Sequence, residues 1–313
     1  MAPTTAVELD KARAGDVRAL ARLISLVEDE SPQVRSVIKD LLPDTGGARV
    51  IGLTGAPGVG KSTVTGALLS AFRAAGRRIA VLAVDPTSPF TGGALLGDRI
   101  RMQEHATDRQ VFIRSMASRG HLGGLAASTP QAIRVLDAAG FDLILIETVG
   151  VGQAEVAIAS LADSVLVLLA PGMGDAVQAA KAGILEVADL FVVNKADKPE
   201  TQQLVRDLRN MIALAQREHG AWKPPIVTTV AVRGEGIDEL VSRLDEHWSW
   251  LNSSGELKSR RQRRAREELA ALAFAELRGR LAASQLDELA SRVADGTLDP
   301  FTAADELLSQ PED

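Results

Sequence analysis

One short run of residues has the composition and spacing of a phosphate-binding loop. Residues 55–62 read Gly-Ala-Pro-Gly-Val-Gly-Lys-Ser, which fits the pattern Gly-x-x-x-x-Gly-Lys-[Ser/Thr]. Such glycines let backbone N–H groups surround phosphate oxygens, and a following helix adds its positive N-terminal end. An apolar run at 50–53 precedes the loop, and a helix-compatible run at 63–75 follows it. The sequence therefore predicts binding of a nucleoside triphosphate.

Two residues of this loop have chemical roles of their own. Lys61 is expected to neutralise the β- and γ-phosphates, and the Ser62 hydroxyl is expected to bind Mg²⁺. An ordinary glycine-rich turn before a helix is the alternative, which the flanking pattern disfavours. The predicted nucleotide contacts here are Gly55, Ala56, Pro57, Gly58, Val59, Gly60, Lys61, Ser62 and Thr63.

A second motif indicates which base is bound. Asn194-Lys195-Ala196-Asp197 follows the buried apolar run 190–193. The Asp197 carboxylate would accept hydrogen bonds from N1–H and the 2-amino group of guanine, whereas adenine would leave it unpaired. The Lys195 stem would lie over the base, and Asn194 would tie this loop to the phosphate loop. Alone, four such residues also fit a solvated polar turn; after a phosphate loop they favour GTP over ATP.

Acidic residues follow two other predicted strands. Asp85 follows the run 78–84, and Asp98 lies further along the same connection. Carboxylates at the carboxyl end of a parallel strand face the ligand crevice, where Mg²⁺ takes oxygen ligands. Asp85 and Asp98 are therefore candidate ligands of Mg²⁺ or of its waters. The alternatives are a helix cap or turn for Asp85 and a surface turn for Asp98.

The run 143–146 ends in Glu147-Thr148-Val149-Gly150. Glu147 stands where most such proteins carry Asp. A buried acid without a partner is costly, so proximity to Mg²⁺ is the simpler explanation for it. The N–H of Gly150 is expected to contact the γ-phosphate, which would make this loop a sensor of hydrolysis.

Composition excludes several classes of protein. The chain has 313 residues, 46% of them hydrophobic, with a formal net charge of −6 and no cysteine. This acidic balance argues against a nucleic-acid partner, and disulfides and thiolate metal sites are excluded. The sequence has no apolar stretch of bilayer-spanning length and no secretory signal. We expect a cytoplasmic protein that does not bind a membrane, or a protein of an organelle matrix if a transit peptide was removed.

The chain reads as three parts. Residues 1–47 form a helical N-terminal extension, 48–250 a P-loop GTPase domain, and 251–313 a helical C-terminal arm. In the middle part, short Val-, Ile- and Leu-rich runs alternate with helical patterns, as in a mostly parallel sheet flanked by helices. This predicts an α/β fold of the P-loop NTPase type. The predicted strands are 49–53, 78–84, 111–115, 143–146, 164–169, 190–193 and 226–230.

The C-terminal part carries a basic run at 258–266. Such a run fits an RNA or membrane patch or a solvated helix face. The lack of interleaved aromatic residues and the acidic pair Glu267-Glu268 favour the solvated face. An apolar stripe follows, and it covers either the rest of this chain or a second copy, so a dimer arm and packing onto the domain both remain open.

Four longer motifs resemble the methylmalonyl-CoA mutase-associated GTPases, the MeaB/ArgK/MMAA family. They are residues 84–99, beginning Val-Asp-Pro-Thr-Ser-Pro; 147–153, Glu-Thr-Val-Gly-Val-Gly-Gln; 170–175, Ala-Pro-Gly-Met-Gly-Asp; and 192–197, Val-Val-Asn-Lys-Ala-Asp. The resemblance implies a C-terminal dimerisation arm and Mg²⁺-dependent hydrolysis of GTP to GDP. It also implies a chaperone that gates adenosylcobalamin delivery to methylmalonyl-CoA mutase and protects the loaded mutase.

The same resemblance suggests roles for further residues. Arg101 is a candidate phosphate contact, with an exposed helix arginine as the alternative. Lys181, in a third mobile loop at 171–183, is expected to couple partner binding to hydrolysis. The guanine loop has Val230-Ala231-Val232, where the family usually shows a Ser-Ala pair, and the N–H of Ala231 is expected to reach guanine O6.

The expected mechanism is in-line attack of water on the γ-phosphate, with Mg²⁺ and Lys61 stabilising the developing charge. Glu147 and Lys181 complete the expected catalytic set. Since neither a water-positioning Gln nor an arginine finger is evident in the sequence, we expect slow intrinsic hydrolysis that the mutase accelerates.

Three alternatives stay open from sequence alone. One is a metallochaperone GTPase for another metalloenzyme, although four scattered histidines and no cysteine offer few metal ligands. Another is a kinase, as the ArgK label suggests, which would favour adenine. The third is a protein that binds GTP only as a structural switch.

Overall fold

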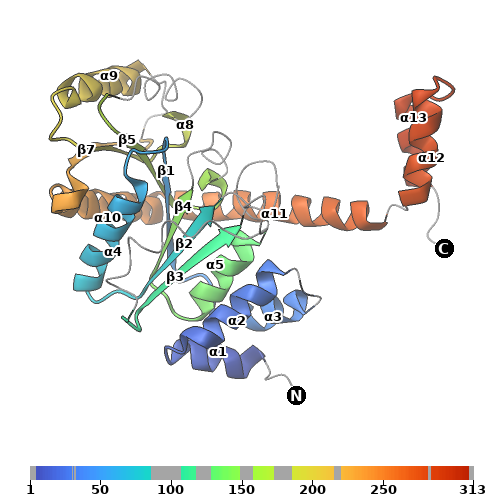
Figure 1. Cartoon of the computed structure of the whole chain (residues 1–313), viewed down its shortest axis with the longest axis horizontal. Helices are drawn as coiled ribbons and strands as arrows, with labels where there is room; N and C mark the ends of the chain where they lie inside the picture. The colour runs from blue at the N-terminus through green and yellow to red at the C-terminus, as the bar shows by residue number, and fades with distance from the viewer. Residues whose placement is uncertain are drawn as a thin grey trace. The chain divides into compact units, whose positions relative to one another are not determined.

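The computed structural model describes residues 5–29, 31, 33–85, 107–117, 128–148, 158–172, 185–214, 220–280 and 283–309. Contacts divide the chain into two compact units, 1–257 and 258–313, and each is described by itself (Figure 1). The three-part division predicted from the sequence stays a prediction.

A seven-stranded parallel sheet forms the centre of the first unit, in the order β3-β2-β4-β1-β5-β6-β7. All seven predicted strands are present, with ends within two residues of those expected, and the predicted fold class is confirmed. The strands are β1 (Arg49–Thr54), β2 (Ile79–Asp85), β3 (Val111–Ala117), β4 (Leu143–Thr148), β5 (Ser164–Leu169), β6 (Leu190–Asn194) and β7 (Ile226–Thr229).

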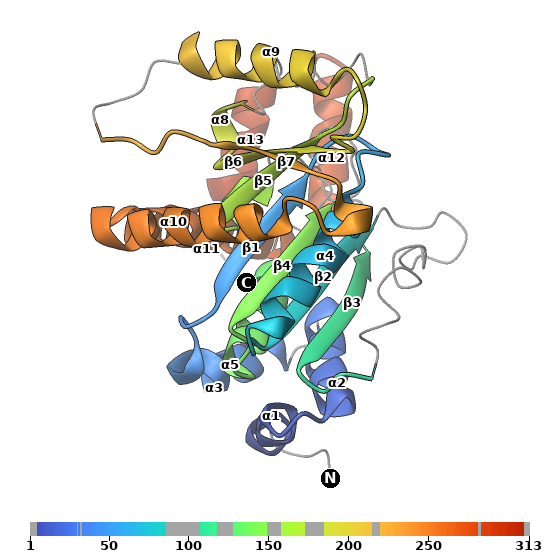
Figure 2. The ribbon, with the colours of Figure 1, turned by 90° about the vertical axis from the view of Figure 1, so that its left-hand side faces the viewer.

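Helices cover both faces of the sheet, which explains the continuously apolar strands. Every residue of β1, β4, β5 and β6 is buried. Successive strand residues point to opposite faces, so Val50 packs in one core cluster and Ile51 in the other. The first cluster includes residues of α2 (Val17–Glu28), α5 (Thr129–Ala138) and α9 (Thr201–Leu214). The second includes residues of α4 (Lys61–Ala74) and α10 (Ile237–Ser254). Figure 2 views the sheet from the side of α4 and α10.

Within the described residues, three α-helices precede the sheet. The buried stripe of α2 is Leu20, Leu23, Ile24 and Val27, and α2 and α3 pack against α5. Asp16 caps α2 by accepting hydrogen bonds from the N–H groups of Arg18 and Ala19. The helices of the first unit are α1 (Thr5–Arg13), α2 (Val17–Glu28), α3 (Val34–Leu41), α4 (Lys61–Ala74), α5 (Thr129–Ala138), α8 (Leu185–Val187), α9 (Thr201–Leu214) and α10 (Ile237–Ser254).

The amino edge of the sheet has its own buried polar cluster. His247 of α10 is fully buried, with Nδ1 2.9 Å from Ser164 Oγ and Nε2 3.3 Å from Asp189 Oδ1. Trp222 packs on the His247 ring with 4.8 Å between ring centroids, and Trp250 stacks on it at 5.8 Å. This cluster joins α10 to the amino ends of β5 and β6.

Arg49, at the start of β1, joins the same helix to the central strand. Its guanidinium donates to Asp245 Oδ1 at 2.9 Å and to the Leu244 carbonyl oxygen, and it lies 5.3 Å from the centre of the Trp248 ring. Burial lowers the pKa of Arg49, and the hydrogen bond to Asp245 opposes that shift. These contacts, together with those of His247, hold the second half of α10 against the sheet.

The second unit is helical and largely exposed. It contains most of α11 (Glu256–Arg280), then α12 (Ala283–Ala294) and α13 (Pro300–Ser309). Leu269, Leu272, Phe274 and Leu277 of α11 are all exposed. Within α12 and α13, Leu289 and Ala303 are buried, and Arg292 pairs with Glu306 at 2.9 Å.

Close packing at Gly52 of β1 gives a stability prediction. A Cβ at this position would lie 2.6 Å from Cγ1 of the buried Ile158. Because the core around it is closely packed, Gly52→Ala should lower the free energy of unfolding by about 1–3 kcal/mol in urea denaturation. Gly66→Ala in α4 is the matched control: nothing lies within 4 Å of its Cβ position, and helix propensity predicts a gain of roughly 0.5–1 kcal/mol. Equal shifts in the two variants would contradict this account.

Candidate functional site

The predicted phosphate loop joins β1 to α4 at the carboxyl edge of the sheet. Gly55 and Gly60 have φ of 142° and 97°, and Gly60 caps α4 in the left-handed region. A Cβ at Gly55 would collide with the Leu168 carbonyl oxygen, and one at Gly60 with the Asn194 side-chain amide. Both positions therefore need glycine for conformation and for space. Pro57 is exposed in this loop, and Thr63 lies in the first turn of α4.

The Lys61 side chain curls back over its own loop. Its Nζ donates to the carbonyl oxygens of Gly55 at 2.8 Å and Ala56 at 3.2 Å, and the residue is 8% exposed. The ammonium group is thus held beside the segment whose N–H groups are predicted to bind phosphate.

Glu147 reaches this loop from the end of β4. Parallel pairing of β4 with β1 sets Glu147 opposite Leu53, two residues before the loop. Ser62 Oγ donates to Glu147 Oε1 at 2.6 Å, and Thr65 Oγ1 donates to Oε2 at 2.9 Å. The carboxylate is 3% exposed. The structure therefore brings the predicted pair Ser62 and Glu147 together, and Thr65 joins them.

The predicted guanine loop is tied directly to the phosphate loop. Asn194 Nδ2 donates to the Val59 carbonyl oxygen at 2.9 Å, and Lys195 Nζ donates to the Gly58 carbonyl oxygen at 2.7 Å. Lys195 has a φ of 58°, in the left-handed region. Two consecutive residues at the end of β6, Asn194 and Lys195, thus bind two consecutive carbonyls of the phosphate loop, in keeping with the tie that the sequence suggests for Asn194.

Asn194 also organises the segment after β7. Its Oδ1 accepts hydrogen bonds from Thr229 Oγ1 at 3.1 Å and from the Ala231 N–H at 3.2 Å. The sequence assigns that N–H to guanine O6, whereas here it donates to Asn194. Val230 is buried in this segment, and the neighbouring Val232 is 81% exposed.

Asp197 has a basic neighbour on the same segment. Its side chain is 48% exposed, and Oδ2 lies 3.9 Å from an Arg233 guanidinium nitrogen. Arg233 also donates to Glu235 at 2.7 Å, a hydrogen bond that raises the pKa of Arg233. Since all three groups are exposed and screened by solvent, Asp197 remains accessible to a ligand.

Other predicted site residues lie outside the described part of the chain. They are Asp98, Arg101, Gly150 and Lys181. Asp85 ends β2, but its side chain is also outside the described atoms. Among the residues described, no three His, Asp or Glu side chains gather as a metal-binding group.

Sequence reasoning missed three residues of this site. Thr65 and Thr229 donate hydrogen bonds to Glu147 and Asn194, and the exposed Arg233 guanidinium lies 3.9 Å from Asp197. A signal was available for Thr65, because a hydroxyl three residues after Ser62 lies on the same face of a helix. None was available for Thr229 or Arg233, whose contacts depend on the pairing of β6 with β7.

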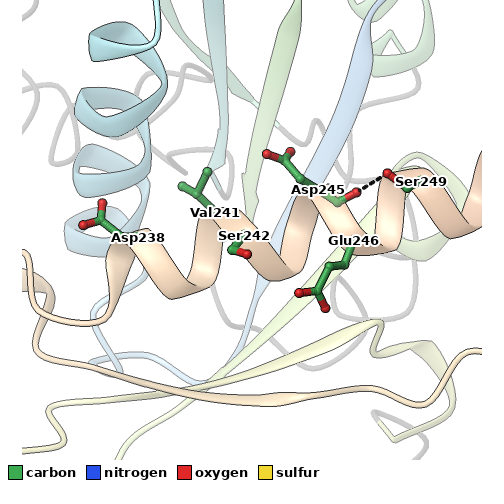
Figure 3. Close-up of a pocket in the computed structure, with 6 residues that line it drawn as sticks. All are labelled: Asp238, Val241, Ser242, Asp245, Glu246 and Ser249. Carbon is green, nitrogen blue, oxygen red and sulfur yellow. Dashed lines mark hydrogen bonds between the residues drawn. The ribbon is translucent and has the colours of Figure 1, made fainter.

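A separate hollow of about 690 Å³ lies along α10 (Figure 3). Its lining comes from α10 alone: Asp238, Val241, Ser242, Asp245, Glu246 and Ser249. The one hydrogen bond drawn there runs along the helix, from Ser249 Oγ to the Asp245 carbonyl oxygen. Among the described residues, no polar group from a second element lines this hollow, so it is not a candidate ligand site.

A glycine-rich loop between the central strand and a helix, tied to an Asn-Lys-x-Asp loop, defines a P-loop GTPase. A model of the family described as methylmalonyl-CoA mutase-associated GTPase MeaB matches residues 20–285. The chain belongs to this family, and it is a GTP hydrolase.

Individual relatives agree with this assignment. A protein of Pyrococcus abyssi (strain GE5 / Orsay), provisionally named a GTPase, is 48% identical over 309 residues, covering 96% of this chain and 95% of that protein. GTPase ArgK of Escherichia coli (strain K12) is 37% identical over 274 residues, which cover 85% of this chain and 82% of that protein. A crystal structure titled LAO/AO transport system kinase matches with a TM-score of 0.74 and 28% identity, covering 97% of this chain and 96% of that one.

None of the described helices combines the length and the apolar character that crossing a bilayer requires.

The ties made by Asn194 give a prediction for this site. Asn194→Ala removes the partner of the Val59 carbonyl and of two donors after β7. Leaving buried polar groups unpaired costs about 1–3 kcal/mol each, so we expect a clear loss of unfolding free energy and weaker GDP binding by calorimetry. Asn210→Ala, on the exposed side of α9, is the matched control and should change neither. Unchanged stability and affinity in Asn194→Ala would refute the assignment.

Proposed function

We propose that this GTPase is a chaperone that gates adenosylcobalamin delivery to methylmalonyl-CoA mutase and protects the loaded mutase. The mutase part of the proposal is supported by the family to which the chain belongs. The nucleotide part is supported by one observation: Asn194 and Lys195 of the guanine loop bind the carbonyls of Val59 and Gly58. Occupancy of the base site and of the phosphate site is thereby coupled mechanically.

GTP binding in this proposal uses both loops. The N–H groups of 55–63 face the phosphates, and Lys61 balances the charge on the β- and γ-phosphates. Asp197 accepts from N1–H and the 2-amino group of guanine, and the Lys195 stem lies over the base. Arg101 and Gly150 contribute phosphate contacts.

Mg²⁺ fits the donors beside this loop. The Ser62 hydroxyl and a Glu147 carboxylate oxygen lie 2.6 Å apart and are both buried, and hydroxyl and carboxylate oxygens are the donors that Mg²⁺ prefers. Ser62 would hold the ion, with Asp85, Asp98 and Glu147 around it. When bound, the ion would supply positive charge next to the β- and γ-phosphate oxygens.

The protein's own contribution to hydrolysis is electrostatic. Lys61 stabilises charge that develops on the phosphate oxygens as water attacks in line. Both Glu147 oxygens accept hydroxyl hydrogen bonds, an arrangement suited to fixing the surroundings of a cation and not to activating water. Hydrolysis is therefore slow in the isolated chain, and Lys181 couples mutase binding to its acceleration.

The functional form in this proposal is a cytoplasmic homodimer. Leu269, Leu272, Phe274 and Leu277 are exposed along α11, with exposed fractions of 67%, 54%, 71% and 49%. Apolar side chains gathered on one exposed helix favour association with a second copy.

The guanine assignment is tested by Asp197→Asn. The amide keeps an acceptor and adds a donor, so it suits the 2-oxo group of xanthine better than the 2-amino group of guanine. We expect GTP affinity to fall at least tenfold and xanthosine triphosphate affinity to rise, measured by calorimetry. Asp287→Asn, an exposed residue of α12, should keep the wild-type preference. Retained guanine selectivity in Asp197→Asn would show that this carboxylate does not read the base.

The mutase assignment is tested by capture. Purified chain loaded with GDP or with a non-hydrolysable GTP analogue is mixed with an adenosylcobalamin-dependent methylmalonyl-CoA mutase. We expect capture to depend on the nucleotide, and phosphate release in single-turnover GTP hydrolysis to rise when the mutase is added. Equal capture in both states, no capture, or an unchanged rate of hydrolysis would count against the gating role.

A further inference from the structure

Thr65 is placed to control the Glu147 carboxylate. Its side chain is fully buried on α4, and its Oγ1 lies 2.9 Å from Glu147 Oε2. Ser62, one helical turn earlier, donates to the other oxygen, Oε1. Each oxygen of the carboxylate therefore has its own hydroxyl donor from the same face of one helix.

We propose that Thr65 is a positioning residue that fixes the orientation of Glu147 for Mg²⁺–GTP. This inference rests on the proposed placement of Glu147 beside the ion. A carboxylate held at one oxygen still rotates about its last bond, whereas a donor on the second oxygen fixes its plane. Ser62 is also assigned to the Mg²⁺ ion. In this proposal Thr65 binds neither the ion nor the nucleotide, and its role is toward Glu147. It holds the carboxylate in the same place before and after nucleotide binding.

The identity of residue 147 agrees with this role. Glutamate extends one carbon–carbon bond, about 1.5 Å, further from the strand than aspartate. That reach lets the carboxylate span Ser62 and Thr65, which are three residues apart on α4. An aspartate would lose at least one of the two hydroxyls, so Thr65 gives a reason for glutamate at this position.

Thr65 also makes a local hydrogen bond within its own helix, and a test of its role must separate the loss of this bond from the loss of the bond to Glu147. Its Oγ1 lies 3.0 Å from the Lys61 carbonyl oxygen, the ordinary bond of a helical threonine to residue i−4. A hydrogen bond to a charged carboxylate is stronger than one to a neutral carbonyl, so the proton favours Glu147. Ser70, an exposed residue of the same helix, makes a local bond of the same kind, to the Gly66 carbonyl oxygen at 3.0 Å. Ser70→Ala therefore serves as a control for the loss of such a local bond.

The test measures ion binding without turnover. The full chain is saturated with a non-hydrolysable GTP analogue, Mg²⁺ is titrated in, and the half-saturating concentration is read by calorimetry. Loss of a residue that orients a metal-side carboxylate typically weakens the metal about 10- to 100-fold. We expect Thr65→Val to raise the half-saturating Mg²⁺ concentration at least tenfold, while GDP affinity in EDTA stays within twofold of wild type. Thr65→Ser, which keeps the hydroxyl, should restore the wild-type value, and Ser70→Ala should leave it unchanged.

A double-mutant cycle with Glu147→Ala separates positioning from general damage. Thr65→Val in the Glu147→Ala background should add less than a twofold effect, because no carboxylate is left there for Thr65 to orient. Thr65→Ala and Thr65→Ser give the same comparison if Thr65→Val does not fold.

Three results would overturn the inference. One is an unchanged Mg²⁺ requirement in a folded Thr65→Val or Thr65→Ala. Another is an equal loss of GDP affinity in EDTA, which shows a structural role only. The third is full additivity with Glu147→Ala. A wild-type chain whose nucleotide binding ignores Mg²⁺ would overturn the proposed ion site as well, and so distinguishes that failure from this one.

Discussion

One buried amide holds the nucleotide end of this molecule together. Asn194 donates to Val59 in the phosphate loop and accepts from Thr229 and Ala231 at the end of β7. Three loops that follow different strands, β1, β6 and β7, therefore share one side chain. Breaking any of these bonds would leave a buried polar group unpaired, so this side chain stabilises the three loops together.

The parallel sheet makes this arrangement possible. Because β4 and β5 flank β1, and β6 lies next to β5, the carboxyl ends of these strands meet along one edge. Glu147 arrives from one side of the phosphate loop, and Asn194 arrives from the other. The helix that begins at Lys61 then supplies the hydroxyls that meet Glu147. The functional side chains lie together at this edge because the carboxyl ends of all the parallel strands lie there.

Much of this could be predicted from the sequence, for identifiable reasons. Strands buried on both faces leave continuous apolar runs, such as 143–146, and a phosphate loop leaves a fixed glycine pattern. Hydrogen bonds that cross between elements leave no such trace. The donations of the Ala231 N–H and of Thr229 Oγ1 to Asn194 depend on the tertiary approach of β6 and β7, and neither residue looks unusual until its neighbour is known.

The aromatic cluster at the opposite edge has a practical consequence. The chain has three tryptophans, and Trp222, Trp248 and Trp250 all pack around His247 and Arg49, next to the amino ends of the strands. The length of the strands separates these indoles from the phosphate loop. Their ultraviolet emission is therefore a natural reporter of whether α10 is packed on the sheet.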